Sequence, residues 1–540
     1  MQSSVFKLNR HIIISISLIL LLAPLFFGEY YILLYTKGIF SYSLDDPFIH
    51  MAIAKNIVLH NTWGVTKYEF ASASSSILYP LVLAIFFKFF GVNIIAPFII
   101  NIIAAIILII LIQKRYHKLG IPPIFQLLGL TGIIFLTPLA YIISTGMEHT
   151  LQILFCYLII FSFADWITHE IKNGNKKWKI PLPLYIYGML VTSIRYEGIF
   201  IIITVCLILF FLGKIIPVII YGFISVCPVL IYGFYSKLHG GFFLPNSVIL
   251  KSDNLSLSAN SLVTFFTRIP EKLYYPHAMM HDLLIQKTLI ILPLLYFLFK
   301  NKIPDKTNIR YCIILITAIT VTHLLFAKID FSYRYESYLI VMCLVLVFCI
   351  IPYISFDFEN FKINSSSIIS IGLSVYLVIP FLERGFDSSS TIVPISKRYF
   401  NQNYSMAQFI HKYYDGVPIA VYDLGEVSYF NNNSYILDIG GLGNNEVAKS
   451  YHGGYYNYNF INNIVKEKDI KIAAVFDISI PSQIQSKWKK VATWHSLDFE
   501  IPHYDLQFYA VDSTYTANLL ANLKNYEKVV PKNEIITYYE

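Results

Sequence analysis

A small set of ionisable side chains in this apolar sequence has the residue types that a transfer reaction needs. Ionisable groups are costly near a bilayer, so those that remain there are candidates for function by default. The set joins acids, cations and one histidine: Asp45, Asp46, Glu148, His149, Arg195, Glu197, Lys251, Arg334 and Glu336. We expect all of them to lie near one face of a membrane, in a shared chamber.

Two adjacent acids in front of a proline are the candidates for a catalytic base. Glycosyl transfer from a lipid phosphate needs a base that takes a proton from the acceptor hydroxyl. Asp45 or Asp46 could serve, because Pro47 fixes the local turn that presents the carboxylate. A structural interpretation is compatible with this one: Asp45 could be the N-cap of a helix that begins with an acid and a proline.

Three cations and a histidine could meet the second need of such a transfer. Cationic donors must bind the phosphate leaving group as charge develops on it. We predict that Arg195 and Arg334 do so, because a guanidinium presents paired donors that match phosphate oxygens. Lys251 and His149 are secondary candidates for the same role.

Glu148 has both a structural and a functional interpretation. It either pairs with a nearby arginine, which satisfies a buried charge, or has a catalytic or metal-binding role. Together, Asp45, Asp46 and Glu148 could hold a hard divalent cation, Mg²⁺ or Mn²⁺, through oxygen ligands. Their spacing does not require one.

Two short motifs place an arginine two residues before a glutamate. Residues two apart do not face each other on a helix, so we expect Arg195 and Glu197 to contact different partners. The same argument applies to Arg334 and Glu336. Three histidines are interpreted as structural or interfacial: His50, His60 and His281.

The composition indicates a membrane protein. Of 540 residues, 56% are hydrophobic and only 14% are charged, whereas soluble domains have about 25% charged residues. The net charge of +8 is spread through short loops rather than gathered in a basic stripe, which argues against a nucleic-acid partner. All six cysteines lie in apolar runs without metal-ligand spacing, so we expect them to fill the core.

Apolar runs of about membrane-spanning length define the expected fold. The first covers residues 12–34 behind Lys7 and Arg10, and it is long enough for an uncleaved signal-anchor. Eleven more follow: 77–90, 94–112, 123–143, 151–166, 180–194, 199–212, 215–235, 288–299, 311–327, 338–354 and 367–382.

The loop charges decide which of these runs cross. Cytoplasmic loops carry an excess of Lys and Arg, and the loops 113–118, 170–179 and 300–310 are basic. They fall on one side together only if the short run 77–90 is a non-spanning helix at the outer interface. We therefore predict eleven spans, with the N-terminus in the cytoplasm and the C-terminus outside.

The character of the sequence changes near residue 383. We predict a helical membrane domain over residues 1–383 and a soluble extracytoplasmic α/β domain over residues 384–540. A helix-like stretch at 48–60 lies in the first outer loop. Four short apolar runs of the second domain are typical of buried strands: 418–422, 435–437, 472–476 and 506–511.

The order of several motifs resembles the GT-C glycosyltransferases, which include protein O-mannosyltransferases and the aminoarabinose transferase of lipid A. The resemblance is greatest to the bacterial arabinofuranosyltransferase-like and protein O-mannosyltransferase-like branches, and it touches most of the chain. The motifs that carry it are residues 42–48, 75–81, 86–91, 144–148, 195–198, 245–251, 423–430 and 437–442.

The resemblance implies a polytopic GT-C-like bundle in a bacterial inner membrane. It also implies a polyprenyl-phosphate sugar donor in place of a nucleotide sugar, and an acceptor that is a glycan, lipid or protein of the cell envelope. The catalytic carboxylate of the first outer loop is carried over to Asp45 or Asp46. His149 departs from the pattern, because a small or hydroxyl residue is expected after Glu148.

Two other classes of protein fit part of the pattern. A transporter or flippase for lipid-linked sugars also needs a multi-span bundle, but no inverted repeat is visible and the charges gather at one face rather than at the midplane. A non-catalytic subunit of glycan assembly would share the fold without the chemistry. P-loop, HExxH and Ser-His-Asp hydrolase motifs are absent, which argues against an ATPase, a zinc protease or a lipase.

Overall fold

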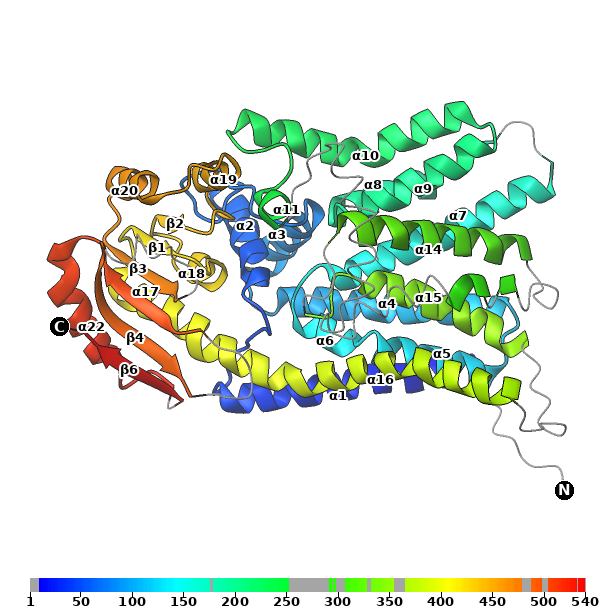
Figure 1. The fold of residues 1–540 in the computed structure, drawn as a ribbon, viewed down its shortest axis with the longest axis horizontal. Coiled ribbons are helices and arrows are strands. Elements are labelled where there is room, and N and C mark those ends of the chain that lie inside the picture. The colour runs from blue at the N-terminus through cyan, green and yellow to red at the C-terminus, as the bar shows by residue number, and fades with distance from the viewer. Residues whose placement is uncertain are drawn as a thin grey trace, which may run out of the picture.

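The chain forms a helical bundle with a sheet domain at one end, in a computed structural model (Figure 1). The structure describes these residues: 9–174, 178–251, 291–294, 296–297, 306–327, 332–353, 365–477, 487–497, 504–531 and 533–539. The bundle and the sheet domain meet at a layer built from the first outer loop. That layer positions the candidate site.

Five helices among the described residues are long and apolar enough to cross a membrane, as in a multi-pass membrane protein. They are α1 (Arg10–Tyr35), α4 (Ala96–Lys118), α7 (His149–Lys172), α10 (Ile215–Leu238) and α14 (Lys306–Phe326). Shorter helices stand at other predicted spans: α5 (Pro123–Leu136), α6 (Leu139–Ser144), α8 (Leu182–Ile194), α9 (Gly198–Phe211) and α15 (Ser337–Ile350), followed by the short η1 (Ile351–Tyr353). Half of the predicted span 288–299 lies outside the described residues, and the described half, residues 291–294 and 296–297, is helical.

The long helix α16 (Ser365–Tyr399) connects the two parts of the chain. The predicted domain boundary at residue 383 falls inside it. One turn of π-helix, η2 (Phe400–Tyr404), leads from α16 into α17 (Ser405–Tyr414), the first helix of the sheet domain. The two domains are therefore joined by a continuous helical path rather than by a flexible linker.

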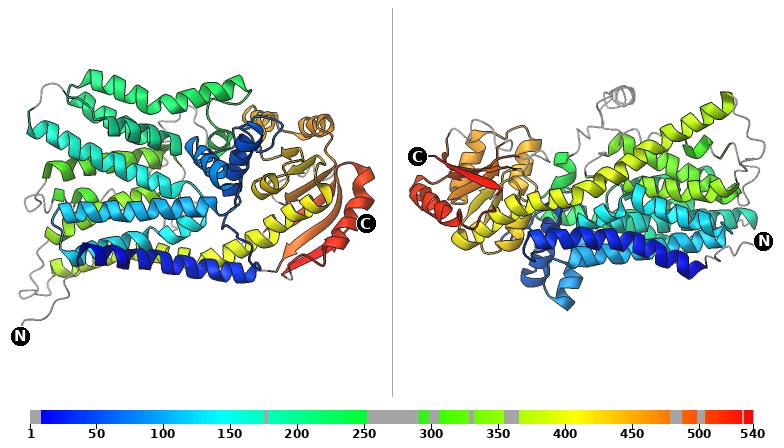
Figure 2. Two further views of the ribbon diagram at one scale, coloured as in Figure 1. Left: turned by 180° about the vertical axis from the view of Figure 1, so that it is seen from behind. Right: turned by 90° about the horizontal axis from the view of Figure 1, so that it is seen from below.

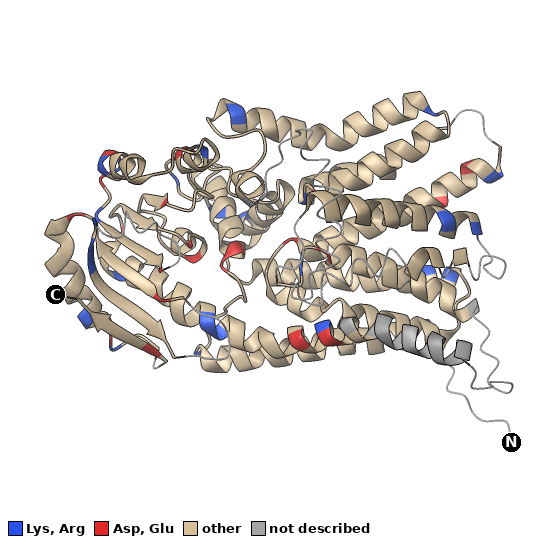
Figure 3. Ribbon diagram, viewed as in Figure 1, with Lys and Arg blue, Asp and Glu red and all other residues tan. Residues whose placement is uncertain are grey.

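Several Lys and Arg residues lie at the end of the bundle that is farthest from the sheet domain (Figure 3). There the buried Arg115 of α4 donates to Asp165 of α7 at 3.3 Å and to Asn308 of α14 at 2.7 Å. Lys214 lies over the ring of Trp178. The basic loops of α4, α7 and α10 thus meet at one end, as a positive-inside arrangement requires. All six cysteines are free and lie buried or half-buried within helices.

Helices α2 (Asp46–His60) and α3 (Leu78–Phe90) lie crosswise to the bundle helices, between the bundle and the sheet domain (Figures 1 and 2). The prediction of a helix at 48–60 is confirmed. Phe48 and Met51 of α2 pack into the core of the bundle, whereas Ile49 and Ile53 pack into the core of the sheet domain. Because α2 buries opposite faces in two cores, it fixes the sheet domain against the bundle.

The sheet domain is a three-layer α/β unit with six strands in the order β2-β1-β3-β5-β4-β6. Strand β1 is parallel to β2 and β3, and the remaining pairs are antiparallel. The strands are β1 (Ile419–Val421), β2 (Ile436–Asp438), β3 (Ile472–Phe476), β4 (Lys489–Ser496), β5 (Leu506–Ala510) and β6 (Glu534–Tyr538). The four predicted strands correspond to β1, β2, β3 and β5; β4 and β6 were not predicted.

Helices cover both faces of the sheet. Helices α17 and α22 (Thr516–Tyr526) pack on one face together with α18 (Gly425–Phe430). On the other face lie α19 (Asn445–His452) and α20 (Tyr458–Glu467). Two short helices complete the described elements: α11 (Asn246–Lys251) beside α19, and η3 (Ser513–Tyr515) before α22. The loops after β1 and β2 lie beside α2 and face the bundle.

Candidate functional site

Asp45 ties the first outer loop to the sheet domain. Its Oδ2 accepts a hydrogen bond from the backbone N–H of Gly425 at 2.7 Å, and its Oδ1 accepts one from Glu426 at 2.8 Å. These amides belong to the first turn of α18, where N–H groups lack partners within the helix and favour a carboxylate. Asp45 is the N-cap residue of α2 by position, but its side chain makes no bond to that helix.

Gly425 is required for this contact. A Cβ on Gly425 would lie 2.2 Å from the backbone oxygen of Asp45 and 2.6 Å from its Oδ2, which no real side chain tolerates. The glycine therefore lets the two backbones approach closely enough for both hydrogen bonds. The Asp45 carboxylate is thereby held in place by residues 380 positions further along the chain.

The junction is rich in acids, and burial raises their affinity for protons. Burial, with Asp423 and then Asp46 nearby, raises the pKa of Asp45 to about 8, although its two backbone hydrogen bonds act in the opposite direction. Burial and the neighbouring Asp45 and Asp423 also raise the pKa of Glu426 well above its usual range. Asp45 and Glu426 therefore hold a proton more tightly than exposed acids do.

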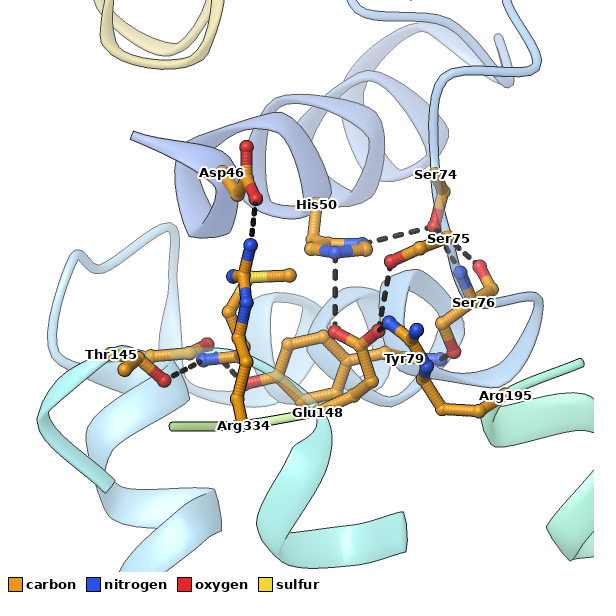
Figure 4. Close-up of polar contacts among 12 residues, drawn as sticks. Asp46, His50, Ser74, Ser75, Ser76, Tyr79, Thr145, Glu148, Arg195 and Arg334 are labelled. Carbon is orange, nitrogen blue, oxygen red and sulfur yellow. Dashed lines mark hydrogen bonds and ion pairs between the residues drawn. The ribbon is translucent and has the colours of Figure 1, made fainter. Parts of the chain in front are cut away.

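Asp46 pairs with Arg334 beside the same junction. Nη2 of Arg334 donates to Oδ2 of Asp46 at 2.8 Å (Figure 4). The Arg334 side chain is 1% exposed, whereas that of Asp46 is 26% exposed. The guanidinium also lies 5.2 Å from the centre of the Tyr335 ring. Asp46 is thus a partly exposed acid, with its partner cation buried behind it.

Glu148 is the centre of a second, fully buried network in the same region (Figure 4). Its Oε1 accepts hydrogen bonds from Arg195 and from Ser75, both at 2.8 Å. Nε2 of His50 lies 3.4 Å from Oε2, and the other nitrogen of that ring bonds to Ser74. The arginine pairing considered for Glu148 is present, and His50, which we interpreted as structural, joins the network.

A glycine turn holds Glu148 at the start of α7. Gly146 has a φ of +69°, and a Cβ there would lie 2.6 Å from the ring of Tyr42. The hydroxyl of Tyr79 donates to the backbone oxygen of Gly146 at 2.7 Å. Only glycine satisfies both the left-handed backbone and the close contact.

The expectation that Arg195 and Glu197 contact different partners was wrong. Nε and Nη2 of Arg195 donate to the two carboxylate oxygens of Glu197 at 3.1 Å and 2.6 Å. Arg195 ends α8 with an extended backbone (φ −154°, ψ 141°), so the helical spacing rule does not apply to it. A third nitrogen of the same guanidinium binds Glu148.

Glu336 forms an ion pair with Arg384 of α16, a residue that the sequence analysis did not single out. Arg384 also donates to the backbone oxygen of Tyr333. Both side chains of the pair are fully buried. The charged pair Glu383-Arg384, directly after the apolar run 367–382, was the signal that could have indicated Arg384.

The remaining predicted residues are only partly placed. His149 is the first residue of α7 and is fully buried, with its ring 5.8 Å from that of Tyr335. Its ring nitrogens have no hydrogen-bond partner among the described residues. The backbone of Lys251 ends α11, but its side chain and all of His281 lie outside the described residues.

The acidic trio considered for a divalent cation is not assembled as a metal site. Among the described residues, no group of three or more His, Cys, Asp or Glu side chains has an arrangement that could hold a metal ion. Asp45 bonds to backbone amides, whereas Asp46 and Glu148 each pair with a different arginine. The three carboxylates therefore have separate partners.

A cavity of about 430 Å³ opens between the first outer loop and the sheet domain. Leu44, Asp45, Asp46 and Ile49 line it on the bundle side. The sheet domain contributes the loops after its parallel strands, including Tyr422, Asp423, Gly440 and Leu442, and also Tyr451 of α19. The carboxyl ends of parallel strands are a common location for ligand sites. Of the candidate acids that pair with an arginine, Asp46 is therefore the one that lines this ligand-sized cavity.

Replacing Gly425 by alanine should loosen the contact between Asp45 and α18. The new Cβ would collide with Asp45, so both backbone hydrogen bonds must break or the sheet domain must shift, at a cost of about 1–3 kcal/mol. We expect a lower unfolding temperature in detergent and faster amide hydrogen exchange in α18.

Gly28 provides the matched control for that substitution. It lies within α1, and a Cβ on it would meet nothing within 4 Å. Gly28→Ala should change stability by no more than about 0.5 kcal/mol. Equal unfolding temperatures and equal exchange in α18 for the two variants would contradict the role given to Gly425.

Comparison with known proteins adds one finding for the sheet domain. None of the curated proteins matches the chain significantly. Residues 395–516 match the model of a family described as Domain of unknown function (DUF8728). The match begins in the last turns of α16 and extends through β5 to the start of α22, so it includes the wall that the sheet domain contributes to the cavity.

Proposed function

We propose that this chain is a membrane glycosyltransferase of the GT-C type. In this proposal it transfers a sugar from a polyprenyl-phosphate donor to a glycan, lipid or protein of the cell envelope. The observation that carries the proposal is the Asp46–Arg334 pair, in which a partly exposed carboxylate lines a cavity and its partner cation is buried behind it. A base next to a phosphate-binding cation is what the transfer requires.

We assign the role of base to Asp46 and a positioning role to Asp45. Both acids border the cavity, but the oxygens of Asp45 each accept a backbone hydrogen bond. The ion pair with Arg334 favours the ionised form of Asp46, which can accept a proton. Asp45 therefore holds the loop, and Asp46 performs the proton transfer.

In the proposed reaction, Asp46 removes the proton of the acceptor hydroxyl. The acceptor oxygen bonds to the anomeric carbon while the bond from that carbon to the donor phosphate oxygen breaks. The electron pair leaves with the phosphate, whose growing charge Arg334 stabilises. The phosphate-binding role predicted for Arg195 stays a prediction, since its guanidinium is occupied by Glu148 and Glu197.

The proposed site of reaction is the extracytoplasmic face of a bacterial inner membrane. Support comes from the basic loops, which lie at the end of the bundle opposite to the cavity and the sheet domain (Figure 3). If that end faces the cytoplasm, the sheet domain faces outward. A polyprenyl-phosphate sugar presented in the outer leaflet would then reach the cavity from the bundle side.

The proposal is tested by incubating the purified full-length protein in detergent with radiolabelled polyprenyl-phosphate sugars and envelope extracts as acceptors. We expect labelled acceptor and released polyprenyl phosphate in equal amounts. Movement of lipid-linked sugar across vesicles without any transfer product would instead indicate a flippase. Neither transfer nor movement with any donor would favour a non-catalytic subunit of glycan assembly.

A further inference from the structure

The cavity beside Asp46 has a wall of unusual composition. Three of its lining residues carry carboxyl groups, namely Asp45, Asp46 and Asp423. None of the described lining residues is a lysine or an arginine. The guanidinium of Arg334 is 1% exposed and stands behind Asp46 rather than in the wall. Among the described lining residues, a negatively charged ligand would therefore meet carboxyl oxygens and no lysine or arginine.

Aromatic rings form the other part of the wall. Tyr422 and Tyr451 are 38% and 37% exposed, although both line the cavity. The ring of Tyr451 stacks on Tyr456 with centroids 3.9 Å apart and an angle of 14°, which fixes its orientation. Partly exposed aromatic rings beside carboxyl acceptors fit a ligand that has both apolar C–H faces and hydroxyl groups.

A rigid loop carries this wall. Asp438 at the end of β2 accepts hydrogen bonds from the backbone N–H of Gly440 at 2.8 Å and of Gly443 at 2.7 Å. A Cβ on Gly440 would lie 3.2 Å from the ring of Tyr422, so the loop is packed against that ring. The sheet domain thus presents Tyr422 as a preformed surface toward Asp46.

We propose that this cavity binds the acceptor, an uncharged carbohydrate. Tyr422 and Tyr451 stack on the sugar rings, and Asp423 accepts hydrogen bonds from the sugar hydroxyl groups. The inference rests on the proposed transferase function, because it assigns the substrate that meets Asp46. It gives the sheet domain the role of selecting the acceptor. The donor phosphate then lies on the bundle side, near the buried arginine.

Binding of saccharides to the full-length protein in detergent tests this inference without requiring turnover. The probes are the neutral disaccharides N,N′-diacetylchitobiose, mannobiose and arabinobiose, with digalacturonate as the acidic counterpart. Saturation-transfer NMR should detect binding of at least one neutral probe. Added digalacturonate should not displace that probe. Tyr422→Ala and Tyr451→Ala should each weaken neutral binding about tenfold, as the loss of a central aromatic contact does.

Two further variants separate a lost stacking surface from a lost fold. Tyr422→Phe keeps the ring and should retain binding. Tyr455→Ala removes an exposed tyrosine of the same domain that is not among the cavity lining, and it should bind like wild type. Tighter binding of digalacturonate, unchanged binding in both alanine variants, or no neutral probe bound would each overturn the inference.

Donor consumption distinguishes this inference from the proposed function. Transfer to the acceptor should fall in Tyr422→Ala together with saccharide binding, whereas Tyr455→Ala should transfer sugar and hydrolyse the labelled donor at the wild-type rate. Transfer that is insensitive to both tyrosines would sink the acceptor site alone. Tyrosine-dependent saccharide binding without transfer from any donor would sink the transferase alone.

Discussion

Replacing Asp46 by asparagine should reduce the rate of sugar transfer by about 10²- to 10⁴-fold, the usual contribution of a general base. Asparagine has nearly the same shape and can still accept a hydrogen bond from Arg334, but it cannot take a proton from the acceptor. The loss should therefore appear in kcat, with little change in the KM for the donor. The measurement is initial-rate transfer from the radiolabelled polyprenyl-phosphate sugar in detergent.

Two variants make this test specific. Asp469→Asn is the matched control, because Asp469 is a largely exposed acid of the sheet domain whose ion pair with Lys471 should contribute little. Asp45→Asn should lower both transfer and the unfolding temperature. The side-chain NH₂ of the new asparagine would face a backbone N–H of α18, so two donors would meet where a hydrogen bond now forms. Wild-type transfer by Asp46→Asn would refute the base assignment. A purely kinetic loss in Asp45→Asn would shift that assignment to Asp45.

Replacing Arg195 by glutamine should destabilise the protein by about 3–5 kcal/mol, because two buried glutamates would lose their shared cation. Glu148 is fully buried, the side chain of Glu197 is only 16% exposed, and both bind the same guanidinium. The measurement is thermal unfolding in detergent, followed by tryptophan fluorescence. Arg195→Lys should lie between wild type and the glutamine variant, since an ammonium keeps the charge but not the bidentate geometry.

The charge argument can be separated from simple loss of packing. The double variant Arg195→Gln/Glu197→Gln removes one stranded carboxylate and should recover part of the lost stability. Arg310→Gln, at an exposed arginine of α14, should remain within about 0.5 kcal/mol of wild type. If Arg195→Gln unfolds at the same temperature as Arg310→Gln, the network does not contribute to stability as argued.

The sequence by itself determined most elements of this protein and the acids and arginines around which the candidate site is built. Apolar run length and the basic loops indicate the helices and their common basic end, because both are local properties of composition. The same holds for the helix at 48–60 and for four strands. Strand β4 was not predicted because it begins with two lysines. Strand β6 was not predicted because it is not a buried apolar run: its residues after Glu534 alternate between exposed and half-buried.

Only the tertiary structure decided how the candidate residues differ. Asp45 and Asp46 are adjacent acids with the same local signal, but one binds α18 and the other binds Arg334. Arg195 and Glu197 pair because both lie in the break between α8 and α9. The cavity needs Tyr422 and Tyr451, which lie hundreds of residues from Asp46. Contacts over such separations depend on how the sheet domain docks on α2, and no local pattern encodes that docking.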